Sequence, residues 1–391
     1  MEGRVDPPRI GEVVATDLNH PPYVVFDRDG REVEPASVFL RDLSLSDVSV
    51  LTCRSYGFDL LRWFRVLWLL DVVWDRATAY EVQVLVGWMR SGRNPQRGRA
   101  ESSSSRPGAV NGRTGKAYLS AGYAPRTINH TLSVIGRFYS FHAQYGRGPV
   151  VSPVPAARER RAVVAHRNPM EPPRTGRRAP LRQKVPKLEP RALSDRCWDE
   201  LFAVLRCDRD RALLACYVSS GARASELLGI GLEEVDWARQ VIFVVSKGSR
   251  LRQAVPVSPE ALRYLVSYLA EAGPPAPGEP LWRTRRGDPR PVTYWAMRRV
   301  LQRANDALGT NRTLHDLRHT AATRLAQDPS ITLPEVRAIL RHADINTTGI
   351  YTATRVEDLF DKLQQHFSAQ RPAQRLATGY DPADAAVVFG A

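Results

Sequence analysis

Residues 314–326 read LHDLRHTAATRLA, a stretch whose spacing places a histidine and an arginine on one face of an expected helix. His315 and Arg318 are three positions apart, so on a helix expected over His315–Gln327 they project from the same side. His319 follows Arg318 directly and is expected to point elsewhere, in a structural role. A histidine at the start of a helix often only bonds the backbone, so the chemistry of this pair depends on the neighbouring segments.

Two further segments lie upstream. GARASELLGI (221–230) follows an expected helix, and VSKGSRLRQAVPV (245–257) spans a turn between two expected strands. The helix is expected over Arg209–Ser220, with Gly221 ending it in the left-handed conformation. Two strands, Val241–Val245 and Ala254–Val257, are expected around the turn that contains Lys247. With an extended piece at 235–237 they predict a small antiparallel sheet.

Downstream, residues 339–352 read ILRHADINTTGIYT and follow a helix expected over Pro334–Leu340. Thr332 and Glu335 form the capping box of that helix. In the first half of the chain, apolar residues recur at helical spacing between 37 and 90, where Thr78 and Glu81 form another capping box, and again after Pro125.

These four segments, in this order and spacing, resemble the tyrosine recombinase (phage integrase) family. The resemblance is strong over about 190–355 and weak over about 37–146. It implies a mainly α fold: an N-terminal helical core-binding (SAM-like) domain, followed by an α+β catalytic domain with a small antiparallel sheet.

Arg223 and Arg318 match the two catalytic arginines of the family. A guanidinium fork can hold two non-bridging phosphate oxygens at once, which an ordinary surface arginine does not need to do. Lys247 matches the lysine that protonates the 5′-oxygen leaving group. Only five of the 56 basic residues are lysines. Arginine cannot release a proton near neutral pH, whereas a lysine with a lowered pKa can.

Tyr351 matches the family's nucleophile, and His342, nine residues before it, matches a histidine that donates to the phosphate. The resemblance gives His315 a proton-transfer or hydrogen-bonding role. An isolated tyrosine would by default be a buried core residue. A phenol has an ordinary pKa near 10 and is unreactive when neutral, so the nucleophile needs the two arginines at the phosphate, which favour the phenolate. One departure is Arg341, which stands where many members have glycine and puts the geometry of that turn in question.

The net charge of +15 favours a polyanionic partner, nucleic acid first. The excess is concentrated at 91–116 (net +5) and 147–190 (net +8), two segments rich in Gly, Ser or Pro. They are either solvated linkers or basic straps that lie along DNA phosphates. The candidate DNA-binding residues in and around them are Arg93, Arg97, Arg99, Lys116, Arg177, Arg178 and Lys184.

The expected organisation has five parts. An N-terminal extension without an assigned role (1–35) precedes a helical DNA-binding domain (36–146) with a flexible basic loop at 91–116. A basic Pro-rich linker (147–190) leads to a catalytic domain with a C-terminal helix (191–367) and a tail expected to be disordered (368–391). An apolar stripe on the C-terminal helix, beginning at Val356 and ending at Phe367, is expected to dock on a neighbouring subunit or on its own domain.

The expected function is site-specific DNA recombination or integration through a 3′-phosphotyrosyl intermediate, without metal, ATP or any other cofactor. No GxxxxGK[ST] loop and no cluster of acidic residues occurs in the sequence. A type IB topoisomerase, a hairpin resolvase and a non-catalytic DNA-binding relative are the alternatives. Expected partners are double-stranded DNA, three further copies in a tetramer on two DNA sites, and possible accessory DNA-bending proteins, but no membrane. The four cysteines form no paired motif, which favours a cytoplasmic, nucleoid-associated protein.

Overall fold

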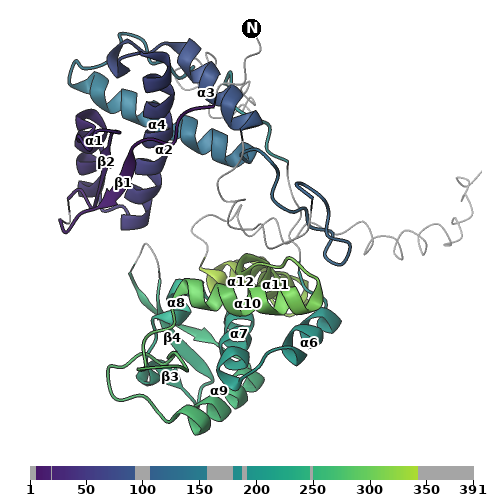
Figure 1. Cartoon of the computed structure of the whole chain (residues 1–391). Coiled ribbons are helices and arrows are strands. Elements are labelled where there is room, and N and C mark those ends of the chain that lie inside the picture. Colours follow the sequence, from purple (N-terminus) through teal and green to yellow (C-terminus); the bar gives the residue numbers. More distant parts are fainter. Residues whose placement is uncertain are drawn as a thin grey trace, which may run out of the picture. The chain divides into compact units, whose positions relative to one another are not determined.

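The computed structural model describes residues 6–18, 20–92, 106–155, 179–186, 192–246 and 250–341 (Figure 1). The chain divides into two compact units, Met1–Leu188 and Glu189–Ala391, and each has its own hydrophobic core. Both units are mainly helical with a small antiparallel sheet, which confirms the expected fold class. In the part of the chain that the structure describes, no helix is long and apolar enough to cross a membrane.

The first unit is built from helices whose apolar faces meet in one core. Its helices are α1 (Glu34–Leu45), α2 (Val50–Leu70), the 3-10 turn η1 (Trp74–Arg76), α3 (Ala79–Ser91) and α4 (Pro125–Gln144). The capping box expected at the start of α3 is present, since Glu81 accepts hydrogen bonds from the backbone and the hydroxyl of Thr78, both at 2.7 Å. Trp63 lies at the centre of the core and donates to the hydroxyl of Tyr139 at 3.1 Å.

Residues 12–26, which the sequence set apart as an extension, contribute a β-hairpin to this same core. Strand β1 (Glu12–Ala15) pairs antiparallel with β2 (Tyr23–Phe26), with Val13 opposite Val25. Val25 is fully buried, and the hairpin packs on α1 and α2. A two-stranded ribbon is marginal by itself, so its stability comes from this packing, which the local sequence does not reveal.

Part of the expected linker also packs on the first unit. The side chain of Asn129 on α4 makes two hydrogen bonds with the backbone of Gln183. Its Nδ2 donates to the carbonyl of Gln183 at 2.9 Å, and its Oδ1 accepts from the N–H of Gln183 at 2.7 Å. Arg182 donates to the hydroxyl of Ser133 at 2.9 Å, and Leu181 packs against the core. Residues 179–186 are therefore held on α4, although no periodic pattern marks them in the sequence.

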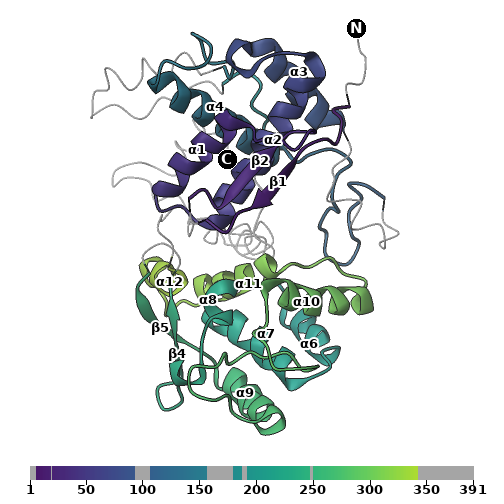
Figure 2. The ribbon, with the colours of Figure 1, turned by 60° about the vertical axis from the view of Figure 1, so that its left-hand side comes forward.

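The second unit is arranged around helix α7, with the sheet on one side and α6 and α10 on the other (Figure 2). Its helices are α6 (Asp195–Ala203), α7 (Asp208–Ser220), α8 (Ala224–Leu228), the 3-10 turn η3 (Leu232–Glu234), α9 (Pro259–Ala272), α10 (Tyr294–Leu308), α11 (Leu314–Gln327) and α12 (Leu333–Leu340). Helix α9 packs along α7, α11 packs on α7, and α12 packs on α11.

The expected three-stranded sheet is present. It consists of β3 (Val235–Asp236), β4 (Val241–Val245) and β5 (Arg252–Pro256), all antiparallel. Strand β5 begins two residues earlier than expected, because Arg252 pairs with Val245 and extends the ladder toward the turn. The guanidinium of Arg252 lies over the ring of Phe243 at 3.9 Å, which stabilises this end of the hairpin by a cation–π contact.

Candidate active site

The site begins where α7 ends, at Gly221. This glycine has φ 55 and ψ 19, the left-handed stop expected from the sequence. A Cβ at this position would lie 2.8 Å from Cδ2 of Leu340, so both the conformation and the close approach of α12 require glycine. The backbone of Ala222 donates to Ser220, and the chain then enters α8 at Arg223. The end of α7 therefore fixes the position of the Arg223 backbone at the start of α8.

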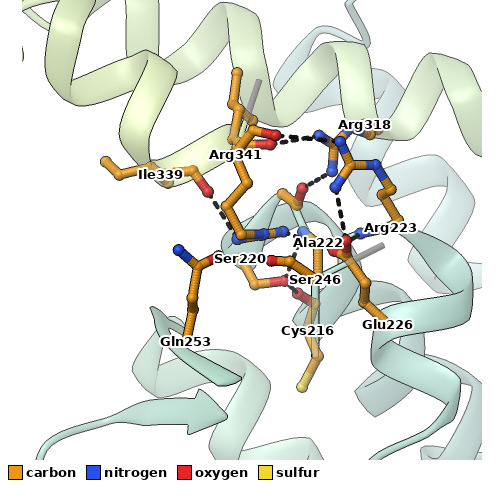
Figure 3. Close-up of polar contacts among 12 residues, drawn as sticks. Cys216, Ser220, Ala222, Arg223, Glu226, Ser246, Gln253, Arg318, Ile339 and Arg341 are labelled. Atoms are coloured by element: carbon orange, nitrogen blue, oxygen red, sulfur yellow. Dashed lines mark hydrogen bonds and ion pairs between the residues drawn. The ribbon is translucent and has the colours of Figure 1, made fainter. Parts of the chain in front are cut away.

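Arg318 ties the ends of two helices together through their backbone carbonyls (Figure 3). It lies in the second turn of α11 and is 8% exposed. Its Nη1 donates to the carbonyl of Gly221, and its Nη2 donates to the carbonyl of Leu340 at 2.7 Å. These two carbonyls have no further intrahelical partner at a helix end, so Arg318 fixes α12 against the end of α7.

Arg223 reaches the same point from α8. Its backbone N–H donates to Oε2 of Glu226 at 2.8 Å, and its Nη1 donates to Oε1 of Glu226 at 2.6 Å. Its Nη2 donates to the carbonyl of Arg341 at 3.2 Å. The side chain of Arg223 remains 32% exposed, whereas that of Glu226 is 1% exposed. The structure thus brings Arg223 and Arg318, which are 95 positions apart, to consecutive carbonyls at the end of α12.

The electrostatics of this cluster are those of an anion-binding site. Burial and, after it, the neighbouring charges of Arg223 and Arg341 together lower the pKa of Arg318 to about 10. Burial also raises the pKa of Glu226, but hydrogen bonds from Arg223 and the charges of Arg341 and Arg223 outweigh it, so the net pKa is lowered. Three guanidiniums therefore gather around one ionised carboxylate. A phosphate at the exposed side of Arg223 would offset part of that excess charge.

His315 lies in the first turn of α11, one helical turn before Arg318, and is exposed. The sequence-based expectation that His319 points elsewhere is wrong. The two imidazoles meet edge to face, with ring centroids 4.1 Å apart. Positions i and i+4 lie on one face of a helix, so His319 is a neighbour of His315 rather than a residue of the opposite side.

Three of the predicted catalytic residues, Lys247, His342 and Tyr351, lie outside the described residues. The two ends of the turn that carries Lys247 are described. The backbone of Ser246 donates to Leu251 at 2.9 Å, and its hydroxyl donates to Gln253 at 2.5 Å. The hairpin is therefore closed on both sides of the turn that carries the predicted general acid.

Of the candidate DNA-binding residues, two are described. Lys116 lies in a turn closed by hydrogen bonds to Asn111, and Lys184 is exposed on the segment 179–186. The other candidates, Arg93, Arg97, Arg99, Arg177 and Arg178, lie outside the described residues. Within the described ranges, no three His, Cys, Asp or Glu side chains gather as ligands for a metal ion.

Sequence reasoning missed the roles of Glu226 and of the Arg341 side chain. Glu226 stands three residues after Arg223 at the start of a short helix, which is the spacing of a capping box and could have identified it. Arg341 ends α12 in the left-handed conformation, with φ 54 and ψ 47, which explains why glycine is favoured there. Its side chain turns back to Glu226, at 2.9 Å, a contact between positions far apart in sequence.

Residues 200–358 match the model of the phage integrase family. The chain is 36% identical over 184 residues to the tyrosine recombinase XerD of Pseudomonas aeruginosa, a match that covers 44% of this chain and 60% of that relative. It is 33% identical over 235 residues to the tyrosine recombinase XerC of Azotobacter vinelandii, covering 59% of this chain and 70% of the relative. The chain thus spans about three fifths of the length of the first relative and more than two thirds of the second.

Solved structures with a similar fold are much less similar in sequence. The Tn1549 transposon integrase in complex with circular intermediate DNA is 14% identical with a TM-score of 0.56, covering 86% of this chain and 99% of that one. A λ integrase dimer bound to a COC′ core site is 13% identical with a TM-score of 0.55, covering 88% and 99%. At such low identity these matches show the fold alone.

Proposed function

Because this chain belongs to the phage integrase family of tyrosine recombinases, we propose that it is a site-specific DNA recombinase that cleaves and rejoins strands through Tyr351. The observation that carries the proposal is the convergence of Arg223 and Arg318 on the end of α12. In sequence, α12 ends at Leu340, eleven positions before Tyr351. Two guanidiniums held close together, with one of them part-exposed, suit a phosphodiester.

In the proposed reaction, Arg223 and Arg318 hold the non-bridging oxygens of the scissile phosphate. The oxygen of Tyr351 attacks phosphorus in line, the phosphorus–O5′ bond breaks, and Lys247 gives a proton to the departing 5′-oxygen. His315 and His342 hydrogen-bond the phosphate and help to move protons. The phosphotyrosyl bond conserves the energy of the broken ester, so attack by another 5′-hydroxyl reseals the strand without ATP or a metal ion.

The proposed partner is duplex DNA, bound by four copies of the chain on two sites. The Tn1549 and λ integrases in the structures of similar fold are each in complex with DNA. The net charge of +15 supports sequence-independent attraction to phosphates, and Lys184, exposed on the segment 179–186, adds to it. The apolar stripe from Val356 to Phe367 would link subunits by a contact that closes into a ring. We also propose that accessory DNA-bending proteins assist the reaction and that the protein is associated with the nucleoid.

Strand exchange tests this function directly. Two duplexes with differently labelled arms, each carrying a candidate recombination site taken from the DNA that flanks the gene, are incubated with the protein without metal or ATP. We expect products that join an arm of one duplex to an arm of the other. A topoisomerase or a hairpin resolvase would nick and reseal without exchanged arms, and a non-catalytic relative would bind without cleaving. Either outcome would contradict the proposal.

Replacing Lys247 with arginine should slow cleavage while leaving DNA affinity within about threefold of the wild type. The charge is retained, but the transferable proton is lost, and general acid catalysis typically contributes about 10²–10⁴-fold. The rate of covalent adduct formation is measured on a nicked suicide duplex and on the same duplex with sulfur in place of the bridging 5′-oxygen. A thiolate leaves without a proton, so the variant should recover on the sulfur substrate. An equal defect on both substrates would rule out the general-acid role.

A further inference from the structure

Arg341 buries a charged side chain at a position that favours glycine. Its side chain is 6% exposed, and its backbone is left-handed. Its Nη1 donates to the carbonyl of Ile339 at 2.8 Å, and its Nη2 donates to Oε2 of Glu226 at 2.9 Å. Its Nε has no hydrogen-bond partner among the described residues. The cost of removing the charges of a buried ion pair from water offsets much of their attraction, and the left-handed backbone adds strain. Stability of the fold alone therefore does not explain this arginine.

Glu226 is shared between the side chains of two arginines, which donate to different oxygens of its carboxylate (Figure 3). Oε1 accepts from Arg223 at 2.6 Å, and Oε2 accepts from Arg341 at 2.9 Å. The backbone carbonyl of Arg341 accepts from Nη2 of Arg223 at 3.2 Å. Arg341 therefore acts on Arg223 in two ways. Its side chain competes with Arg223 for the carboxylate of Glu226, and its backbone carbonyl accepts a hydrogen bond from Nη2 of Arg223.

We propose that Arg341 is a positioning residue. By pairing with Glu226 it neutralises part of the carboxylate charge, so that Arg223 is less strongly bound to Glu226 and remains available to phosphate. This inference rests on the proposed function of the arginine cluster as a phosphate clamp. Because Arg341 is buried, it acts through Arg223 and does not touch the phosphate. If Arg341 were absent, the whole charge of Glu226 would face Arg223, and the attraction of Arg223 for a phosphate oxygen would fall.

The variant Arg341→Gly isolates the side chain, since glycine adopts the left-handed conformation without strain and the carbonyl that Arg223 contacts is kept. On a nicked suicide duplex at saturating concentration, we expect adduct formation to slow by on the order of tenfold, about the effect of one charge-assisted contact. The dissociation constant for DNA should change by less than about threefold, because many other phosphate contacts remain. Adding Glu226→Gln should then restore part of the rate, because it removes the carboxylate charge that would otherwise neutralise Arg223.

The rescue separates positioning from a structural role. If Arg341 only stabilised the fold, removing a second member of the buried cluster would leave the rate unchanged or lower it further. Gln240→Gly is the matched control, since Gln240 also has a positive φ of 56 and is exposed in the same unit. It should relieve a similar backbone strain and leave the cleavage rate as in the wild type.

A second readout does not depend on cleavage. Thermal unfolding is compared in inorganic phosphate and in chloride at equal ionic strength. The general salting-out effect of phosphate is common to all variants, so the difference between variants reports the arginine cluster. We expect Arg341→Gly to lose at least about half of the phosphate-dependent rise in melting temperature, and the double variant to regain it.

The two readouts also separate this inference from the proposed function. If the wild type forms no adduct but the phosphate effect follows the expected order, the recombinase proposal fails and the role of Arg341 stands. If the wild type forms the adduct but the double variant is no faster than Arg341→Gly and gains no response to phosphate, the positioning role is overturned while the recombinase proposal stands.

Discussion

Replacing Tyr351 with phenylalanine should abolish the covalent protein–DNA adduct on a nicked suicide duplex. The substitution removes only the phenolic oxygen, which is the atom proposed to attack phosphorus. Adduct is measured on a denaturing gel, where the wild type should accumulate a band of DNA-linked protein. In the variant this band should be absent, with the rate at least about 10⁴-fold lower.

The same variant should bind DNA within about threefold of the wild type, because affinity for the duplex comes mostly from phosphate contacts that remain. This binding control shows that the loss concerns chemistry rather than folding. If the phenylalanine variant still forms the adduct, another nucleophile must be present. Digestion of the wild-type adduct then identifies it, and a linked peptide without Tyr351 would overturn the assignment.

Replacing Arg318 with alanine should remove cleavage and also weaken the fold. The wild-type guanidinium donates to the carbonyls of Gly221 and Leu340, both of which would lose a buried charged partner. At about 1.5–3 kcal/mol for a hydrogen bond to a charged group, we expect a loss of on the order of 3 kcal/mol in the free energy of unfolding. Loss of a phosphate clamp should lower the rate of adduct formation by at least about 10³-fold.

The control for Arg318 lies on the same helix. Arg324 pairs with Asp195 at 2.6 Å, but its side chain is 39% exposed, and surface pairs of this kind contribute little. Arg324→Ala should therefore leave the cleavage rate unchanged and lower stability by less than about 1 kcal/mol. Arg318→Lys completes the series: it keeps the charge but loses the fork, so cleavage should stay low. A cleavage rate in Arg318→Lys equal to that of the wild type would show that charge alone suffices and would remove the two-oxygen clamp.

The sequence by itself determined several helices and strands of the second unit, with their ends correct to within one or two residues. Gly221 stops α7, Thr332 and Glu335 start α12, and the strands around Lys247 form the expected sheet. These features follow from local properties of the chain: the spacing of apolar residues, the conformational freedom of glycine and the capping of free N–H groups. The order of four short segments was also enough to predict the family.

Only the tertiary structure decided which side chains meet. The bond of Arg318 to Leu340 and the ion pair between Glu226 and Arg341 join segments 22 and 115 positions apart. The packing of the hairpin at 12–26 in the first core and the attachment of Gln183 to Asn129 are also long-range. No periodicity in a single segment encodes such contacts, because they depend on how separate helices pack and on which buried polar groups remain to be paired. Sequence alone therefore identified the residues proposed to act on phosphate, while packing determined how two of them, Arg223 and Arg318, are held together.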